Sequence, residues 1–185
     1  MLDISSALAD LKKVTEVHII SLNNECKELL FVIENKVIKE PKVFCALLQK
    51  DKKEVHQFSY STEKDLEITA KPILTYLYEP DAAILKAGFF KSLAPQFKVD
   101  KIHQHSHLYT SNILVNNFPG KKFQISKILS FNHFLKENKT KKANVVTRNF
   151  DLKPEEIKKK FKIKVFMHIL ISHFILNLHS YAKND

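Results

Sequence analysis

Residues 17–34 read VHIISLNNECKELLFVIE, and this stretch decides how the first part of the chain folds. Its two segments at residues 17–22 and 29–34 are rich in Ile, Val, Leu and Phe, and turn-prone residues lie between them, so the stretch predicts a β-hairpin. Both strands are nearly continuously apolar, which is typical of strands that are covered on both faces. Only a short amphipathic helix precedes them, so part of the expected cover is missing.

That helix and the later elements follow from local patterns. Asp3 can cap a first helix whose apolar face is formed by Ile4, Ala7, Leu8 and Leu11. A helix is expected from Asp81 to Leu93, with Pro80 in its first turn and Pro95 ending it. The other expected elements are a linker at 35–42, a second hairpin at 43–48 and 54–60, strands at 122–129 and 143–147, a weak helix at 133–137 and a last helix that starts near Pro154.

The composition restricts the possible functions of the chain. Its 185 residues, 44% of them hydrophobic, suffice for one ordinary core or two small ones. Gly88 and Gly120 are the only glycines and lie far apart, so a self-contained P-loop or dinucleotide-binding loop is excluded. The net charge is +10, and every basic residue except Arg148 is a lysine. This favours a polyanion partner that is bound without sequence reading.

The cysteines and the apolar segments indicate a reduced, cytoplasmic protein. Cys26 and Cys45 lack CxxC spacing, lie in expected strands and are interpreted as small buried apolar residues. The longest uncharged apolar run, residues 165–178, is 14 residues long, whereas a membrane-spanning helix needs about 20. No signal peptide pattern occurs at the start. We therefore expect no membrane segment.

Several motifs resemble the C-terminal half of a bacterial family of class I S-adenosylmethionine-dependent methyltransferases that carry a ferredoxin-like region and a THUMP-like domain. The matching stretches are MLDI at 1–4, NECKELL at 24–30, YEPDAAILKAG at 78–88, SHLYTS at 106–111, FPG at 118–120 and TRNF at 147–150.

The resemblance implies an α+β fold made of several pieces. Residues 1–36 would be a remnant of the methyltransferase domain, namely a residual helix and a β-hairpin of a Rossmann-like sheet. Residues 40–100 would be the ferredoxin-like region and residues 101–164 the THUMP-like domain. Residues 165–185 depart from the family pattern, which ends in a glycine-containing turn and a strand pair, so they are interpreted as an atypical, altered tail. The chain would be truncated at its N-terminus, where the family has its cofactor site.

The candidate RNA-binding residues are basic or aromatic. Arg148 can hold a phosphate bidentately or form a structural salt bridge, and Tyr109 can stack on a base or lie in the core. The lysines at 158–164 are interpreted as a solvated helix end in preference to a phosphate-binding group. The full predicted RNA-binding set is Arg148, Asn149, Lys121, Lys122, Lys141, Lys142, His107 and Tyr109.

Other candidate sites are weaker. His103, His105 and His107 would share one side of an extended strand, but no nearby cysteine or carboxylate completes a metal site, so no metal is expected. Asp81 is interpreted as a helix-start residue. No catalytic residue and no cofactor-binding residue is assigned on this chain, although the full-length family uses S-adenosylmethionine.

Two functions remain open from the sequence. The first is a noncatalytic, RNA-binding substrate-recognition module of a methyltransferase, whose partner is a structured RNA such as tRNA or rRNA, with no DNA specificity. The second is a nonfunctional remnant, or an interaction domain that docks on a separate methyltransferase chain through the sheet edge of residues 17–34.

The absence of a glycine-rich turn leads to a first prediction. The 185-residue chain alone should neither bind S-adenosylmethionine nor transfer methyl groups, because no segment offers the backbone approach that the cofactor needs. Isothermal titration calorimetry with the cofactor measures this, and micromolar binding would contradict it.

Overall fold

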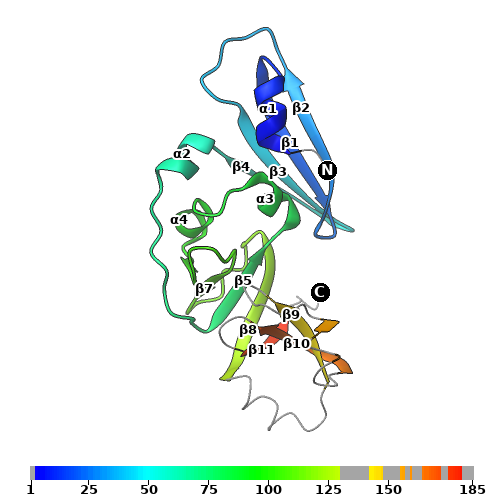
Figure 1. The fold of residues 1–185 in the computed structure, drawn as a ribbon, viewed down its shortest axis with the longest axis vertical. Helices are drawn as coiled ribbons and strands as arrows, with labels where there is room; N and C mark the ends of the chain where they lie inside the picture. Colours follow the sequence, from blue (N-terminus) through cyan, green and yellow to red (C-terminus); the bar gives the residue numbers. More distant parts are fainter. Residues whose placement is uncertain are drawn as a thin grey trace. The chain divides into compact units, whose positions relative to one another are not determined.

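The structure, a computed structural model, describes residues 3–129, 142–147, 155, 156, 159, 164–171 and 175–180. The chain forms two compact units (Figure 1). Unit 1 consists of residues 1–69, 79–99 and 116–120, and unit 2 of residues 70–78, 100–115 and 121–185. With two sheets and a few short helices, the fold is α+β, as predicted.

Unit 1 contains a four-stranded sheet built from two hairpins. Its strands are β1 (Val14–Leu22), β2 (Glu25–Ile33), β3 (Lys42–Gln49) and β4 (Lys52–Phe58), in the order β2-β1-β3-β4. Asn23 and Asn24 join β1 to β2 with φ angles of 51° and 64°, the left-handed pair that a two-residue hairpin turn requires. Both hairpins were predicted from the sequence.

The two hairpins meet through a parallel pairing of β1 with β3. Val17 lies opposite Val43 and Ile19 opposite Cys45, and all four side chains are fully buried. Residues 1–36 therefore share one sheet with the segment that follows them. The predicted domain boundaries at 36, 40 and 100 stay predictions. The pairing of β1 with β3 joins residues on either side of the boundary at 36.

Helices cover one face of this sheet. Helix α1 (Ile4–Asp10) is capped by the Asp3 carboxylate, which accepts the Ser6 N–H at 2.9 Å, as the sequence predicted. Helix α3 (Ala82–Ala87) packs against β1, β2 and β3, and its Ala83 carbonyl accepts the Cys45 thiol at 3.7 Å. The buried side chains of β1 and β3 point to this inner face.

The predicted helix from Asp81 to Leu93 is wrong in length. Pro80 is the last residue of strand β5 (Tyr76–Pro80), and Asp81 is the N-cap of α3. Gly88 ends α3 in the left-handed conformation, with φ 84°. A separate helix α4 (Leu93–Phe97) contains Pro95, which its first turn tolerates because an N–H there has no helical partner.

A short helix that the sequence did not predict fixes the approach to α4. Helix α2 (Tyr60–Asp65) contains Glu63, whose carboxylate accepts the backbone N–H groups of Phe90, Lys91 and Ser92 at 2.7–2.9 Å. The Ser92 hydroxyl donates to the same carboxylate at 2.5 Å. These bonds satisfy the donors ahead of α4, so the 88–92 segment needs no regular structure.

Aromatic rings fill the core between these helices and the sheet. Phe89 stacks on Phe58 at 4.6 Å between ring centroids, and Phe97 meets Phe118 edge to face at 5.7 Å. Phe89 and Phe118 are at most 1% exposed. The core of unit 1 thus joins residues from β4, the 88–97 segment and the FPG motif.

Unit 2 is organised around a second sheet, to which β5 also belongs. Its order is β6-β7-β5-β8-β11-β10-β9. Leu77, Leu108 and Phe123 form a buried cluster on it. The remaining strands are β6 (Asp100–Lys101), β7 (Tyr109–Ser111), β8 (Gly120–Leu129), β9 (Lys142–Thr147), β10 (Lys164–Ile171) and β11 (Ile175–Ser180).

The C-terminal part contains two paired strands. Strands β10 and β11, which lie largely in the segment interpreted from the sequence as an atypical tail, pair antiparallel, and β11 also pairs with β8. Their β-branched and leucine residues suit strands even without a glycine turn. The predicted strands at 122–129 and 143–147 are confirmed, whereas the weak helix at 133–137 lies outside the described residues.

Helical backbone at Glu155, Glu156 and Lys159 agrees with the expected last helix. In the part of the chain that the structure describes, no helix has both the length and the apolar character to cross a membrane.

The two glycines lead to a second prediction, on stability. A Cβ on Gly120 would lie 2.8 Å from Pro80 Cα and 2.9 Å from Asp81 N, both backbone atoms that cannot move aside. Gly120→Ala should therefore lower the free energy of unfolding by roughly 2 kcal/mol or more. Gly88→Ala meets no atom within 4 Å, so only its left-handed backbone should cost about 1 kcal/mol. Urea unfolding of both variants measures the difference, and equal losses would contradict it.

Candidate nucleic-acid interface

The predicted RNA-binding residues fall on several parts of unit 2. Lys121 and Lys122 lie at the start of β8, and Lys142 begins β9. Strands β11 and β10 separate β8 from β9 in the sheet. Lys141, Arg148 and Asn149 lie outside the described residues.

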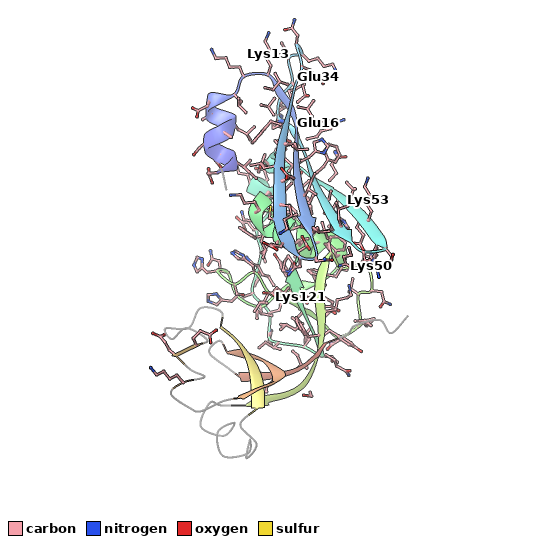
Figure 2. The ribbon with its side chains drawn as sticks, turned by 90° about the vertical axis from the view of Figure 1, so that its right-hand side faces the viewer. Lys13, Glu16, Glu34, Lys50, Lys53 and Lys121 are labelled. Carbon is pink, nitrogen blue, oxygen red and sulfur yellow. The ribbon has the colours of Figure 1, made fainter. Side chains whose placement is uncertain are left out.

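Lys121 and Lys122 point to opposite faces of the sheet, because successive side chains alternate along a strand. Lys121 is exposed and Lys122 is half-buried. Figure 2 labels Lys121 at the start of β8. Of this pair, Lys121 is the more exposed residue.

Tyr109 is not available to stack on a base. It lies in β7 opposite Tyr78 of β5, and both side chains are fully buried. Of the two roles that the sequence left open for Tyr109, the core role is correct. The reason is the register: β7 is an inner strand between β5 and β6, so its side chains have sheet neighbours on both sides.

The three histidines do not form an extended row. Residues 104 and 105 make a turn, and the His105 N–H donates to Nδ1 of His103 at 3.1 Å. His103 and His105 are exposed, whereas His107 is half-buried. Among the described residues, no group of three His, Cys, Asp or Glu side chains could hold a metal ion.

A buried lysine that the sequence analysis missed organises this loop. Lys101 is 4% exposed, and its ammonium group donates to the Gln104 carbonyl at 2.8 Å. Burial, and after it the charge of Lys101, lower the pKa of His107. No sequence signal could have found Lys101, because it sits in a two-residue strand whose burial depends on the distant β7.

The cysteines and Asp81 do not form a nucleophilic site. Cys45 is fully buried, and burial raises the pKa of its thiol, so it packs as the small apolar residue that was predicted. Cys26 is only partly buried, and burial raises its pKa as well. Asp81 is 3% exposed and accepts the Ala83 N–H at 2.9 Å, which is a capping role.

Comparison with known protein families identifies two domains in this chain. Residues 76–119 match the model of a ferredoxin-like domain, and residues 120–168 match that of a THUMP domain-like region. The chain contains both domains. The ferredoxin-like match covers β5 to the FPG motif, and the THUMP-like match begins at β8 and runs into β10.

A solved structure extends the similarity to nearly the whole chain. It is the crystal structure of a "putative methyltransferase from Porphyromonas gingivalis W83", which is 28% identical with a TM-score of 0.88. The match covers 98% of this chain and 49% of that chain, so this chain spans about half the length of the protein it resembles. Comparison with curated proteins gave no match.

The lowered pKa of His107 gives a third prediction. The unfolded chain holds the His107 proton more tightly than the folded protein, so folding stability should fall as the pH drops from about 6.5 through the pKa of the folded state. His107→Gln removes this contribution and should reduce the stability difference between pH 7.5 and pH 5. His105→Gln, an exposed ring in the same loop, is the control. Urea unfolding at both pH values checks this, and the same pH dependence in wild type and His107→Gln would refute it.

Proposed function

We propose that this chain is the noncatalytic, RNA-binding part of a methyltransferase, and that the THUMP-like domain positions a structured RNA. The observation that carries the proposal is the distribution of charge. Residues 120–168 hold 14 of the 30 basic residues but only 4 of the 20 acidic ones. This segment therefore accounts for the entire net charge of +10, and the rest of the chain is neutral.

Positive charge that is concentrated in one segment favours binding to the phosphate backbone of a nucleic acid. Lysines neutralise phosphates and release counterions, which supplies affinity without reading bases. Thirteen of the fourteen basic residues in the segment are lysines, and the fourteenth is Arg148. THUMP domains are of an RNA-binding type, so the THUMP-like match supports a structured RNA such as tRNA or rRNA as the partner. The solved neighbour, described as a "putative methyltransferase", supports the methyltransferase part of the proposal.

The noncatalytic part of the proposal follows from the two glycines. Gly120 packs against the backbone of residues 79–81, and Gly88 closes α3, so neither offers a cradle for S-adenosylmethionine. Neither glycine therefore supplies the close backbone approach that S-adenosylmethionine needs, which supports the noncatalytic part of the proposal. In this proposal the methyl transfer belongs to a part of the methyltransferase that this chain does not provide.

The fourth prediction tests RNA binding directly. The chain should bind a structured tRNA with an affinity that falls steeply with salt. The double variant Lys121→Ala/Lys122→Ala should weaken binding and lower the slope of log K against log salt by roughly 1 for each phosphate that is no longer neutralised. Arg148→Ala should cost about 1.5–3 kcal/mol, because a charge-assisted hydrogen bond is the strongest kind. Filter binding at several salt concentrations measures all three.

A matched control removes the same charge from unit 1. Lys50 and Lys53 are both exposed around the turn between β3 and β4 (Figure 2), so Lys50→Ala/Lys53→Ala also loses two positive charges. If this control weakens binding as much as the β8 variant, binding follows net charge rather than the THUMP-like domain. No binding at low salt would instead favour the remnant.

A further inference from the structure

An exposed aliphatic side chain lies on a fixed loop of unit 2. Ile113 follows strand β7 and is 79% exposed. Its carbonyl accepts the hydroxyl of Ser111 at 2.5 Å and that of Tyr78 at 3.1 Å. The Val115 N–H donates to the same Tyr78 hydroxyl at 3.0 Å. These bonds hold the backbone at and after Ile113, so its side chain is presented to solvent with little backbone freedom left to lose on binding.

The residue that anchors this loop is buried. Tyr78 is fully buried in β5, opposite Tyr109 of β7. A buried tyrosine hydroxyl needs hydrogen-bond partners, and that of Tyr78 finds them in the backbone of residues 113 and 115. The conformation of the loop therefore depends on the core of unit 2, which is typical of a recognition loop that a rigid scaffold positions.

Aromatic and polar residues adjoin Ile113 on one face of the unit 2 sheet. Ser111, whose hydroxyl holds the loop, lies directly opposite Tyr76 of β5, so both side chains are on the same face. We call it the loop face. Tyr76 is half-buried there, and beside it the Thr75 hydroxyl donates to Oδ1 of the exposed Asn112 at 3.4 Å. The amide N–H2 group of Asn112 can therefore donate to a ligand next to Ile113 while its oxygen stays on Thr75.

The basic segment begins on the same face. Strand β8 lies beside β5, and its Phe123 packs with Leu77 of β5 in the buried cluster of the other face. Because side chains alternate along a strand, Lys122 lies on the loop face. Asp100 of β6 lies on the other face, since the register places both Asp100 and Leu77 opposite Thr110. A phosphate at the loop face would therefore meet the charge of Lys122 and not the carboxylate of Asp100.

An apolar side chain on such a face selects one part of an RNA. Ile113 cannot bind a phosphate, and in a paired RNA helix the flat faces of the bases are stacked on one another. An unpaired base offers an apolar face for packing and free edges for hydrogen bonds. The loop face offers the matching groups, namely the aliphatic side chain of Ile113, the amide of Asn112 and the ring of Tyr76, with Lys122 for the phosphate.

We infer that the loop face binds an unpaired nucleotide of the RNA, with Ile113 against the base, Asn112 at its edge and Lys122 near its phosphate. This inference rests on the proposed function and extends it, because phosphate contacts by lysines position an RNA without reading its bases. Tyr78 is a positioning residue, since it holds the loop from the core. In this arrangement the ferredoxin-like segment contributes the base contact and the THUMP-like segment the charge.

The fifth prediction compares a tRNA, which has unpaired nucleotides in its loops and at its 3′ end, with a fully paired RNA duplex. Ile113→Ala should weaken tRNA binding roughly threefold or more and leave duplex binding unchanged, because the lost contact is to an unpaired base. The slope of log K against log salt should keep its wild-type value, since no charge is removed. Filter binding at several salt concentrations measures both, and the side chain is exposed enough that folding should persist.

Two further variants separate recognition from structure. Ile38→Ala makes the same change at an exposed position of the linker in unit 1 and should leave the binding of both RNAs unchanged. Tyr78→Phe removes the hydroxyl that holds the loop, so it should weaken binding of tRNA but not of the duplex. An equal loss of both affinities in Tyr78→Phe would show a merely structural role and overturn the positioning role.

The outcomes distinguish this inference from the proposed function. Equal tRNA binding by wild type and Ile113→Ala would overturn the inference, as would an equal loss of tRNA and duplex binding in that variant. The proposed function survives either result if tRNA binding still falls with salt and weakens in Lys121→Ala/Lys122→Ala. Absence of tRNA binding by wild type would overturn both. Self-association that Ile113→Ala abolishes while tRNA binding stays unchanged would assign the loop to a protein contact and overturn the inference alone.

Discussion

The parallel pairing of β1 with β3 is the interaction on which unit 1 depends. Strand β2 runs back antiparallel to β1 and ends beside the first residues of β1. Strand β3 starts at that same end, opposite Glu16, so the short linker at 34–41 can reach it without a crossover helix. Two locally coded hairpins thereby become one sheet with one core. The same geometry leaves β2 at an edge, because β1 is now paired on both sides.

Local elements were accessible from the sequence, and long-range pairings were not. Asn23 and Asn24 code the first hairpin turn by themselves, and Asp3 codes the cap of α1, so both were predicted correctly. The expected 81–93 helix breaks at Gly88, which ends α3 in the left-handed conformation, a local stop signal that the prediction passed over. The irregular path of residues 90–92 after it is a long-range effect, because their N–H groups donate to the Glu63 carboxylate. Strands β5 and β7 were missed for the same reason, since each is short and defined by its partner.

In the candidate site, the sequence predicted the charge of the residues but not the direction of their side chains. The sequence identified a basic surface from Lys121, Lys122, Lys141, Lys142, Arg148 and the lysines at 158–164, and their charge needs no coordinates. It could not assign Tyr109, whose burial follows from its register with Tyr78, nor Lys101, whose ammonium group turns inward to the Gln104 carbonyl. The role of a lysine or a tyrosine on a strand is decided only when the pairing of that strand fixes which way the side chain points.

Charge and apolar surface lie on different parts of this chain, and the separation has a physical consequence. A domain that bound RNA through the same face that docks a protein would have to desolvate lysines in an apolar interface, which is costly unless each is paired. Here the whole net charge lies in residues 120–168, while the exposed aliphatic side chains of Leu22, Leu30 and Val55 lie on the sheet of unit 1. The lysines that would bind phosphate in the proposed function therefore belong to another part of the chain than these aliphatic side chains.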